Sequence, residues 1–340
     1  MIGYYAHHRG AGHLTRMRSI AAALEEPLWG LSSAAPPYGW DGGWTTLARD
    51  DDPDPGSLAD RDPTAHGVLH WAPTHHEGLA RRSAQLAAWA ADEHPRALVV
   101  DVSVEVSLLA RLCGVPTVVV AMPGLRDDPP HRLAYDSADA LLAPWPRGAH
   151  DLHWPDHWFA KAWFVGAISR FDDRRVPEPV ATRASDPTVL VLWGAGGRST
   201  TAEQLHEAQA ATPGWTWVER SPGTTGSDEL WDELQAADVV VTHAGQNAVA
   251  EVAAARRPAV VVAQPRPHDE QVATARRIDD WRIAVGCQAW PPAHEWPELL
   301  DRALARGGQG WSRWSTGDGA TRVAAHLAGL TCPGVPDAGS

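Results

Sequence analysis

The chain of 340 residues is 44% hydrophobic and 21% charged, a globular balance that excludes wholesale disorder and leaves room for two domains. Its net charge of −13 at pH 7 argues against a nucleic-acid partner and gives no support to membrane contact, because both need basic surface. Three scattered cysteines, no secretory leader at Met1 and no apolar run of membrane-spanning length lead us to expect a cytoplasmic protein.

The first half of the chain alternates short apolar runs with helical patterns. We expect strands at residues 2–6, 97–100 and 117–121 and a helix at residues 15–24. Such alternation predicts a parallel sheet. Residues 36–63 are rich in Asp, Gly and Pro, which predicts irregular surface structure.

A glycine-rich turn with Gly10, Gly12 and His13 follows the first strand directly and precedes a helix. It is not a dinucleotide fingerprint, because Thr15 stands where the third glycine would be. The dipole at a helix N-terminus disfavours an imidazolium, so we expect His13 to be neutral and able to act as a general base. The alternative is a histidine that only hydrogen-bonds the turn.

Carboxylates are competing candidates for the base. Asp101 and Glu105 lie where a strand ends and a helix begins, although Asp101 can equally be an N-cap. Asp127 and Asp128 follow the strand-end turn at residues 122–124 and can reach the acceptor, or they can be solvated loop carboxylates.

Histidines at 150, 153 and 157 have a spacing that zinc ligands also show. Pro155 breaks the helix that would align them. We therefore expect surface histidines here and no metal site.

Prolines and charges interrupt every periodicity at residues 169–187, which predicts a linker. The expected domains are residues 1–168 and 188–330, followed by a flexible tail at 331–340. The second domain opens with a strand at 188–193. A second glycine-rich turn with Gly194, Gly196, Gly197 and Arg198 follows it and leads into a helix.

Residues 239–271 carry the strongest pattern in the chain. An apolar strand ends at His243, Gly245 allows close backbone approach, and a helix begins whose N–H groups can bind a diphosphate. Glu251 lies in this helix, where a carboxylate can accept hydrogen bonds from ribose hydroxyls. A strand at 259–263 then leads to Glu270 and Gln271, at the strand end that faces the ligand in such sheets.

This segment resembles the donor-binding signature of GT-B glycosyltransferases of the MurG-like type, which have the glycosyltransferase family 28 C-terminal domain. The shared features are a His-x-Gly turn, a helix with a Glu, and a Pro followed by an acidic residue and Gln. The resemblance implies an α/β fold with two Rossmann-type domains facing each other across a cleft. It also implies that the Gly10–Gly12–His13 turn belongs to the acceptor side.

The resemblance further implies a role for each donor-side residue. The diphosphate is expected to contact His243, Gly245, Gln246, Asn247 and the turn at Gly194, Gly196, Gly197 and Arg198. Ribose is expected at Glu251 and the sugar hydroxyls at Glu270 and Gln271. The base pocket is expected near residues 219–225.

The implied reaction is transfer of a sugar from a nucleoside diphosphate donor, UDP in the first place, to an acceptor hydroxyl. We expect inversion, no metal and no cofactor beyond the nucleotide-sugar itself. A lipid, a cell-wall precursor or a natural product is the expected acceptor. A nucleotide-sugar epimerase or hydrolase and a non-catalytic sugar-nucleotide-binding protein remain alternatives.

Overall fold

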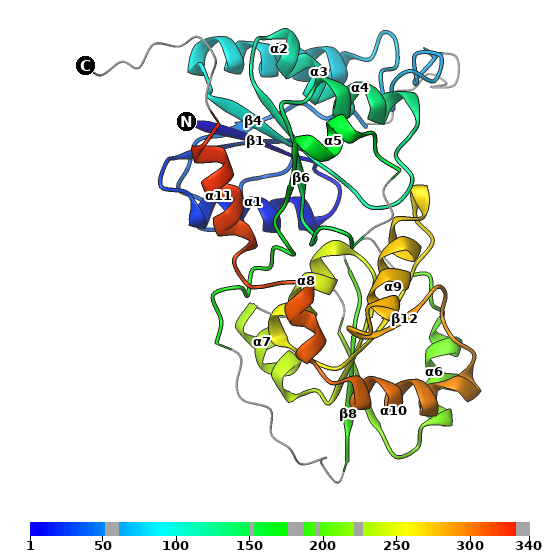
Figure 1. The fold of residues 1–340 in the computed structure, drawn as a ribbon. Helices are drawn as coiled ribbons and strands as arrows, with labels where there is room; N and C mark the ends of the chain where they lie inside the picture. Colours follow the sequence, from blue (N-terminus) through cyan, green and yellow to red (C-terminus); the bar gives the residue numbers. More distant parts are fainter. Residues whose placement is uncertain (52–60, 150–152, 176–185, 195–197, 221–226, 331–340) are drawn as a thin grey trace.

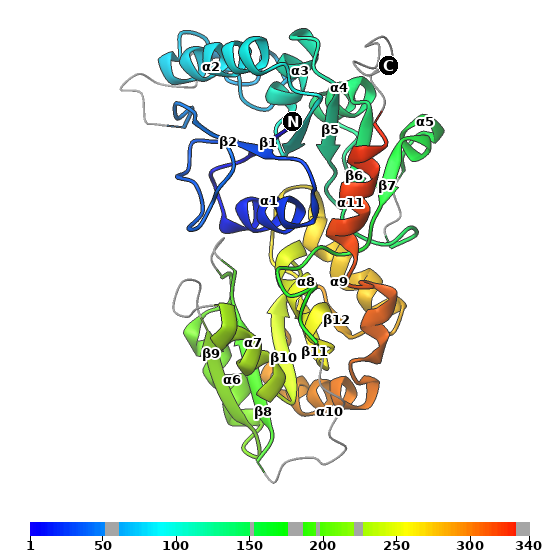
Figure 2. The same ribbon diagram turned by 90° about the vertical axis from the view of Figure 1, so that its left-hand side faces the viewer.

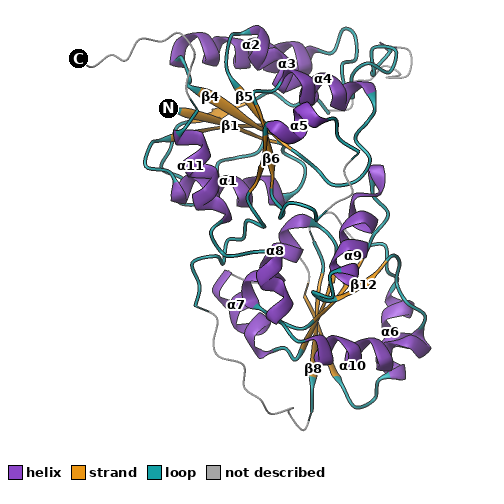
Figure 3. Ribbon diagram, viewed as in Figure 1, coloured by secondary structure: helices purple, strands orange, loops and turns teal. Residues whose placement is uncertain are grey.

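The computed structural model describes residues 1–51, 61–149, 153–175, 186–194, 198–220 and 227–330. Within these residues the chain forms two parallel β-sheets, each flanked by helices (Figures 1 and 3). The strands are β1 (Ile2–Ala6), β2 (Leu28–Ser32), β3 (Trp44–Thr46), β4 (Ala97–Asp101), β5 (Thr117–Val120), β6 (Ala140–Ala143), β7 (Ala162–Phe164), β8 (Thr188–Leu192), β9 (Thr216–Arg220), β10 (Val239–His243), β11 (Ala259–Val262) and β12 (Val285–Cys287).

The helices are α1 (Ala11–Ala23), α2 (Glu77–Glu93), α3 (Val104–Leu112), α4 (Pro129–Ser137), α5 (Asp156–Ala160), α6 (Ala202–Ala211), α7 (Ser227–Ala236), α8 (Gln246–Ala255), α9 (Glu270–Asp280), α10 (Trp296–Arg306) and α11 (Gly319–Ala328). Short 3₁₀ turns are η2 (Pro267–Asp269), η3 (Ala293–Glu295) and η4 (Gln309–Arg313). No described helix is both long enough and apolar enough to span a bilayer.

Apart from Asp101 at the end of β4, the central strands β4 and β11 are apolar, because helices cover both faces of each sheet. β4 reads ALVVD and β11 reads AVVV, and every residue of both strands is buried. Side chains that are buried on both faces give this continuous pattern in place of apolar–polar alternation. The predicted parallel α/β fold is confirmed.

The strand order places the ligand-binding edges. The first sheet has the order β3-β2-β1-β4-β5-β6-β7, and the second has the order β12-β11-β10-β8-β9. In each sheet the order reverses beside the first strand, between β1 and β4 and between β8 and β10. Ligands in open parallel sheets bind beyond the carboxyl ends of the strands at such a reversal. The turns after β1, β4, β8 and β10 are therefore the places where chemistry is expected.

One predicted irregular stretch is partly ordered. β3 lies within residues 36–63 and pairs in parallel with β2, so the expectation of irregular structure is wrong for Trp44–Thr46. The described residues on either side of it contain no α-helix or strand, and residues 52–60 lie outside the described part. Three residues at the edge of a sheet are too few to show a period, which is why the pattern missed this strand.

The last helix returns to the first sheet. α11 packs beside α1, as both views of the fold show (Figures 1 and 2), and its Val323 and Leu327 are fully buried in the core under that sheet. Arg96 donates a hydrogen bond of 2.7 Å to the carbonyl of Leu327. The expected domain limits stay a prediction. The packing of α11 shows that a single cut in the sequence does not separate the two bodies.

We predict that Leu327→Ala lowers the free energy of unfolding by about 2–5 kcal/mol, because it leaves a cavity in the core of the first sheet. Denaturant titration measures the change, and Thr321→Ala, an exposed change on the same helix, is the control. Equal stability of the two variants would show that α11 contributes nothing to the first domain.

Candidate functional site

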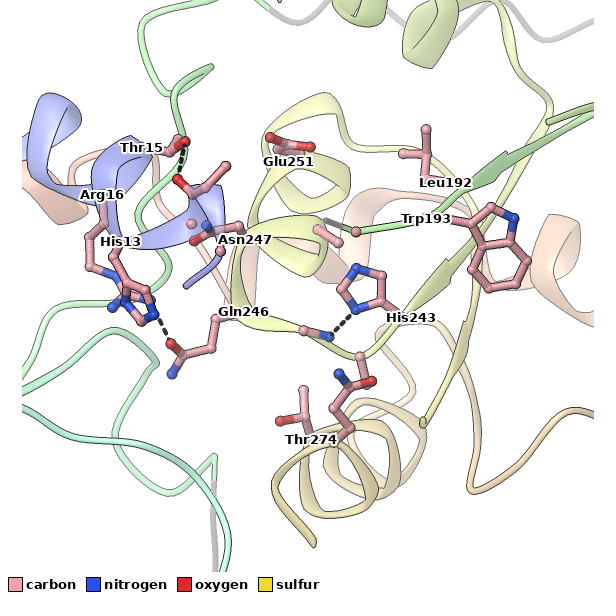
Figure 4. Close-up of a pocket in the computed structure, with 18 of the residues that line it drawn as sticks. His13, Thr15, Arg16, Leu192, Trp193, His243, Gln246, Asn247, Glu251 and Thr274 are labelled. Carbon is pink, nitrogen blue, oxygen red and sulfur yellow. Dashed lines mark hydrogen bonds between the residues drawn. The ribbon is translucent and has the colours of Figure 1, made fainter. Parts of the chain in front are cut away.

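A cavity of about 490 Å³ lies between the carboxyl ends of the two sheets and is lined from both domains. Figure 4 shows the N-terminal part of α1 opposite the start of α8. The cavity contains these residues predicted from the sequence: Gly10, Gly12, His13, Gly194, His243, Gly245, Gln246, Asn247, Glu251, Glu270 and Gln271. Segments as far apart as residues 10 and 271 thus converge at one place.

His13 forms a pair with Asp101 on the acceptor wall. Its Nδ1 lies 3.0 Å from Asp101 Oδ1, close enough for electrostatic attraction between the ring and the carboxylate, and Nε2 is the ring nitrogen left for a substrate proton. His13 stands in the first turn of α1, which begins at Ala11 and therefore earlier than the predicted residue 15. A histidine next to an ionised carboxylate is compatible with the predicted role of general base.

Asp101 is fully buried at the end of β4 and is held by three side chains. Arg16 Nη1 donates to both carboxylate oxygens, at 2.8 and 2.9 Å, and the hydroxyl of Tyr4 donates at 2.8 Å. Burial alone would raise the pKa of Asp101, but Arg16 and His13 outweigh burial and hold it well below its usual range. Asp101 thus stays ionised and positions His13. It is not the N-cap of α3, because Ser103 accepts the hydrogen bond from the N–H of Val106.

Glu105 and Asp127 do not line this cavity. Glu105 accepts hydrogen bonds from the backbone N–H groups of His70 at 2.8 Å and Trp71 at 3.0 Å, so its carboxylate anchors a loop. Asp127 is exposed and lines a separate hollow over α4 and α5. Of the predicted bases, only His13 and Asp101 come together at the cleft. A strand-end position alone does not determine where a side chain points.

His243 lies at the end of β10 and faces the donor side. Its Nδ1 accepts a hydrogen bond of 3.0 Å from the N–H of Gly245, and its buried Nε2 has no hydrogen-bond partner. Burial, helped by the charge of Arg266, lowers the pKa of His243 to about 4. The ring is therefore neutral at pH 7. Its Nε2–H is an unsatisfied donor at the position expected for a diphosphate.

Glycines let the donor-side turns approach this ring. A Cβ on Gly194 would lie 2.3 Å from His243 Nε2, and one on Gly245 would lie 2.4 Å from His243 Cε1. Any larger residue would displace the imidazole. Gly12 has the same property across the cleft, where a Cβ would lie 2.3 Å from Asn247 Nδ2.

The start of α8 is open to a ligand and also touches the first domain. Gly245 is its N-cap and offers no side-chain cap, so the first N–H groups lack a side-chain acceptor. Gln246 accepts a hydrogen bond of 2.6 Å from Arg16 Nη2, and its own buried Nε2 has no partner. An unpaired amide beside an uncapped helix start suits an anion.

Glu251 faces the cavity but is paired with Arg170. Glu251 Oε1 lies 2.9 Å from Arg170 Nε, and the side chain of Glu251 is 14% exposed. Burial raises the pKa of Glu251, and Arg170 opposes this shift. Arg170 falls at the start of the predicted linker, where no local pattern indicated a binding residue.

Glu270 and Gln271 are adjacent but have different partners. Glu270 forms an ion pair of 2.9 Å with Arg126 of the first domain, while burial raises the pKa of the Glu270 carboxyl. Gln271 is buried and accepts a hydrogen bond of 3.1 Å from the N–H of Gln264. Both side chains still line the cavity. Arg126 was not expected from the sequence, and no motif around it would have indicated it.

The second glycine-rich turn is described only in part. Gly194 lines the cavity, whereas Gly196 and Gly197 lie outside the described residues. Arg198 is exposed and forms an ion pair of 2.5 Å with Glu219, and it is not among the residues lining the cavity. Of the expected base pocket at residues 219–225, residues 221–225 lie outside the described part, whereas Arg220 lines the cavity, as does Leu230 further along the chain.

A second cavity of about 340 Å³ adjoins the first one through His13, Met122 and Glu270. Its wall contains the apolar side chains of Val102, Val104 and Tyr135. Val102 has a φ of 68°, a strained conformation for a β-branched residue and one that tends to occur at functional sites. The predicted base thus stands where the two cavities meet.

The predicted surface histidines are partly tested. His157 lies 2.8 Å from Asp136 on the surface and His153 is exposed, while His150 lies outside the described residues. Among the described residues, neither side chain belongs to a cluster of His, Cys, Asp or Glu residues close enough together to bind a metal ion.

Parts of the chain are similar to known protein sequences. Residues 189–288 match the glycosyltransferase family 28 C-terminal domain. The chain is 35% identical over 171 residues to the UDP-N-acetylglucosamine–N-acetylmuramyl-(pentapeptide) pyrophosphoryl-undecaprenol N-acetylglucosamine transferase of Clavibacter michiganensis subsp. michiganensis. This alignment covers 42% of the chain and 45% of that protein. The corresponding protein of Clavibacter sepedonicus is 34% identical over the same shares. The chain thus matches less than half the length of these relatives.

Solved structures share the fold over nearly the whole chain. The glycosyltransferase of kitacinnamycin has a TM-score of 0.63 at 18% identity, covering 96% of this chain and 98% of that one. The spinosyn rhamnosyltransferase SpnG has a TM-score of 0.62 at 16% identity, and the match covers 96% of each chain. MurG of Acinetobacter baumannii has a TM-score of 0.61 at 14% identity, and the match covers 97% of this chain and 99% of MurG. The predicted resemblance to MurG-like proteins and the GT-B-like fold are confirmed.

We predict that His243 titrates near pH 4 and that the free energy of unfolding falls as the pH drops from about 6.5 to 4. In that window the unfolded chain binds a proton that the folded site rejects. NMR titration of the His243 ring gives the pKa directly, and His243→Asn should show a smaller loss of stability over the same window. A measured pKa at or above 6.5 would contradict the buried, neutral imidazole.

Proposed function

We propose that this protein is an inverting glycosyltransferase. It moves a sugar from a nucleoside diphosphate donor, with UDP as the proposed nucleotide, to an acceptor hydroxyl. One observation supports it above the others. An unpaired donor at His243 and the open start of α8 face a cleft whose opposite wall holds the His13–Asp101 pair. The family match at residues 189–288 supports the donor side of this proposal.

The donor half of the mechanism rests on stabilising the leaving diphosphate. As the glycosidic bond breaks, negative charge develops on the β-phosphate. Fixed donors act most strongly on charge that appears only in the transition state. His243 Nε2–H, the first N–H groups of α8 and the turn at Gly194 can supply these donors without reorganisation. Glu251 is proposed to accept from the ribose hydroxyls and Glu270 and Gln271 from the sugar.

The acceptor half rests on proton removal by His13. Nδ1 lies 3.0 Å from Asp101, so Nε2 is the nitrogen proposed to take the proton of the acceptor hydroxyl while that oxygen attacks the anomeric carbon. The new glycosidic bond forms on the face opposite to the departing diphosphate, which inverts the configuration. Asp101 stabilises the resulting imidazolium and remains ionised throughout.

The fixed donors also explain why the donor side needs no cation in this proposal. Amide dipoles and neutral imidazole N–H groups can balance a diphosphate that in other enzymes is held by magnesium. Arg266 lines the same cavity and adds positive charge near His243. We therefore propose that the leaving-group site needs neither a metal nor a cofactor beyond the donor.

The acceptor is proposed to enter through the second cavity, which meets the first at His13. The names of the related proteins span two acceptor types. The Clavibacter relatives act on a pyrophosphoryl-undecaprenol lipid, and SpnG was solved with spinosyn aglycone. The apolar wall formed by Val102, Val104 and Tyr135 suits the nonpolar part of either class.

A nucleotide-sugar epimerase is the second candidate, because the fold also occurs in a putative UDP-N-acetylglucosamine 2-epimerase from Listeria monocytogenes, at a TM-score of 0.61 and 12% identity. That likeness concerns the fold alone. The two activities separate by experiment. A transferase releases UDP only when an acceptor hydroxyl is supplied, whereas an epimerase converts the donor without any acceptor.

We predict that His13→Ala lowers acceptor-dependent UDP release by about 10²–10⁴-fold while UDP affinity changes by less than about twofold, because the base acts only in the transition state. His206→Ala, an exposed histidine on α6, is the matched control. Near-normal turnover of the His13 variant would remove it as the base. Parallel loss of UDP binding would instead make it a structural part of the cleft.

We predict that Glu251→Ala weakens UDP binding by about 1.5–3 kcal/mol, the cost of losing hydrogen bonds to a charged acceptor. Calorimetric titration with UDP measures this. Arg170→Ala separates the roles, because it removes the ion-pair partner and leaves the carboxylate available. If both variants lose affinity equally, the pair acts as a unit, and Glu251 has no ribose contact of its own.

A further inference from the structure

Three histidines and one aspartate gather on the acceptor side, where the two domains meet. His70 comes from the loop before α2, Asp128 and His131 from the start of α4, and His268 from η2 in the second domain. One potential ligand atom from each of the four lies within 4.8 Å of all the others. No part of the proposed sugar transfer uses this group.

The distances from the His70 and His268 nitrogens to the Asp128 carboxylate fit ligands of one bound ion better than hydrogen bonds. His70 Nε2 lies 3.4 Å from Asp128 Oδ1, and His268 Nδ1 lies 3.7 Å from Asp128 Oδ2. Both are longer than ordinary hydrogen bonds. Zinc bonds of about 2.0–2.1 Å at tetrahedral angles place neighbouring ligand atoms about 3.3–3.4 Å apart. Small side-chain rotations of His70 and His268 would therefore complete such a centre.

His131 has a supporting position. Its Nδ1 lies 2.7 Å from Asp128 Oδ2, and its Nε2 lies 3.3 Å from Arg126 Nη1. Both ring nitrogens are thus occupied, with Nδ1–H donating to the carboxylate. A hydrogen bond of this kind orients a ligating carboxylate and tunes its affinity. The ligands that remain are two imidazoles and one carboxylate.

Backbone contacts hold two of these ligands in place. The N–H of His70 donates to the Glu105 carboxylate at 2.8 Å, so this contact fixes the backbone of the His70 loop. The carbonyl of His268 accepts from the N–H of Leu125 at 3.2 Å, and His268 itself has a left-handed φ of 62°. The second-domain ligand is therefore pinned to the first domain by its own backbone.

The nearby charges permit a cation. Arg126 is the closest positive group, and its other guanidinium nitrogen is paired with Glu270 at 2.9 Å. The charge of Arg126 is thereby largely balanced, and the Asp128 carboxylate stays available to an ion. Apart from Arg126 and the clustered histidines, the charged or titratable side chains on the wall of the adjoining cavity are His13, Tyr135 and Glu270.

We propose that His70, Asp128 and His268 bind a divalent transition-metal ion, Zn²⁺ by the chemistry of its ligands, which joins the two domains beside the acceptor cavity. Two imidazoles and a carboxylate with one open position form a recurrent zinc site. The open position faces the cavity of about 340 Å³ that His70 and His268 line. It can take water or an oxygen of the acceptor. This ion is separate from the donor diphosphate, and its binding does not depend on sugar transfer.

The test is zinc binding by the full chain after treatment with a chelator. We expect one equivalent of Zn²⁺ by calorimetry, and Co²⁺ in its place should give the visible absorption of a tetrahedral centre. Asp128→Asn and His268→Ala should each lower the affinity by more than the roughly 10–100-fold that loss of a supporting residue causes. Asparagine preserves the N-cap that Asp128 provides for α4, so this variant should fold.

His294→Ala, an exposed histidine of the second domain outside the group, is the control and should bind zinc as the unaltered protein does. Mg²⁺ should not compete, because it prefers oxygen ligands. The proposal is overturned if the chain binds no stoichiometric zinc, or if the Asp128 and His268 variants bind it as tightly as the control. Neither result bears on UDP binding or acceptor-dependent UDP release.

Discussion

The buried carboxylate of Asp101 is the constraint on which the acceptor wall depends. A fully buried anion is costly unless its neighbours supply charge and hydrogen bonds. Tyr4, His13 and Arg16 do so here, at distances of 2.8 to 3.0 Å. Loss of any of them would leave the buried charge less well compensated, and the His13 ring lies directly beside it. The position of the proposed base is thus linked to the neutralisation of one buried charge.

The same network reaches the second domain. Arg16 uses one guanidinium nitrogen for Asp101 and the other for Gln246, the first residue of α8. The helix start that faces the proposed diphosphate is therefore tied to the carboxylate that orients the proposed base. Arg126 and Glu270 make a second tie on the other side of the cleft. Both contacts join the two domains directly at the proposed site.

The donor side followed from sequence because its parts are neighbours along the chain. His243, Gly245 and the start of α8 lie within one strand–turn–helix unit, and an apolar run followed by a glycine and a helical period predicts that unit locally. The hydrogen bond from Gly245 to His243 spans two residues. The match at residues 189–288 covers the same unit. Local geometry of this kind needs no knowledge of the rest of the fold.

The sequence by itself determined the parallel α/β pattern, the turns that carry His13 and His243, and the uncapped helix start, because each depends on residues close in the chain. Only the tertiary structure decided which carboxylate faces His13. Asp101 and Glu105 are four residues apart at one strand end, yet the first is buried beside Arg16 and the second anchors the loop at His70. Arg170 and Arg126 likewise gain their roles from partners 81 and 144 residues away. Such pairings depend on how the two sheets pack together, and a local sequence pattern does not predict that packing.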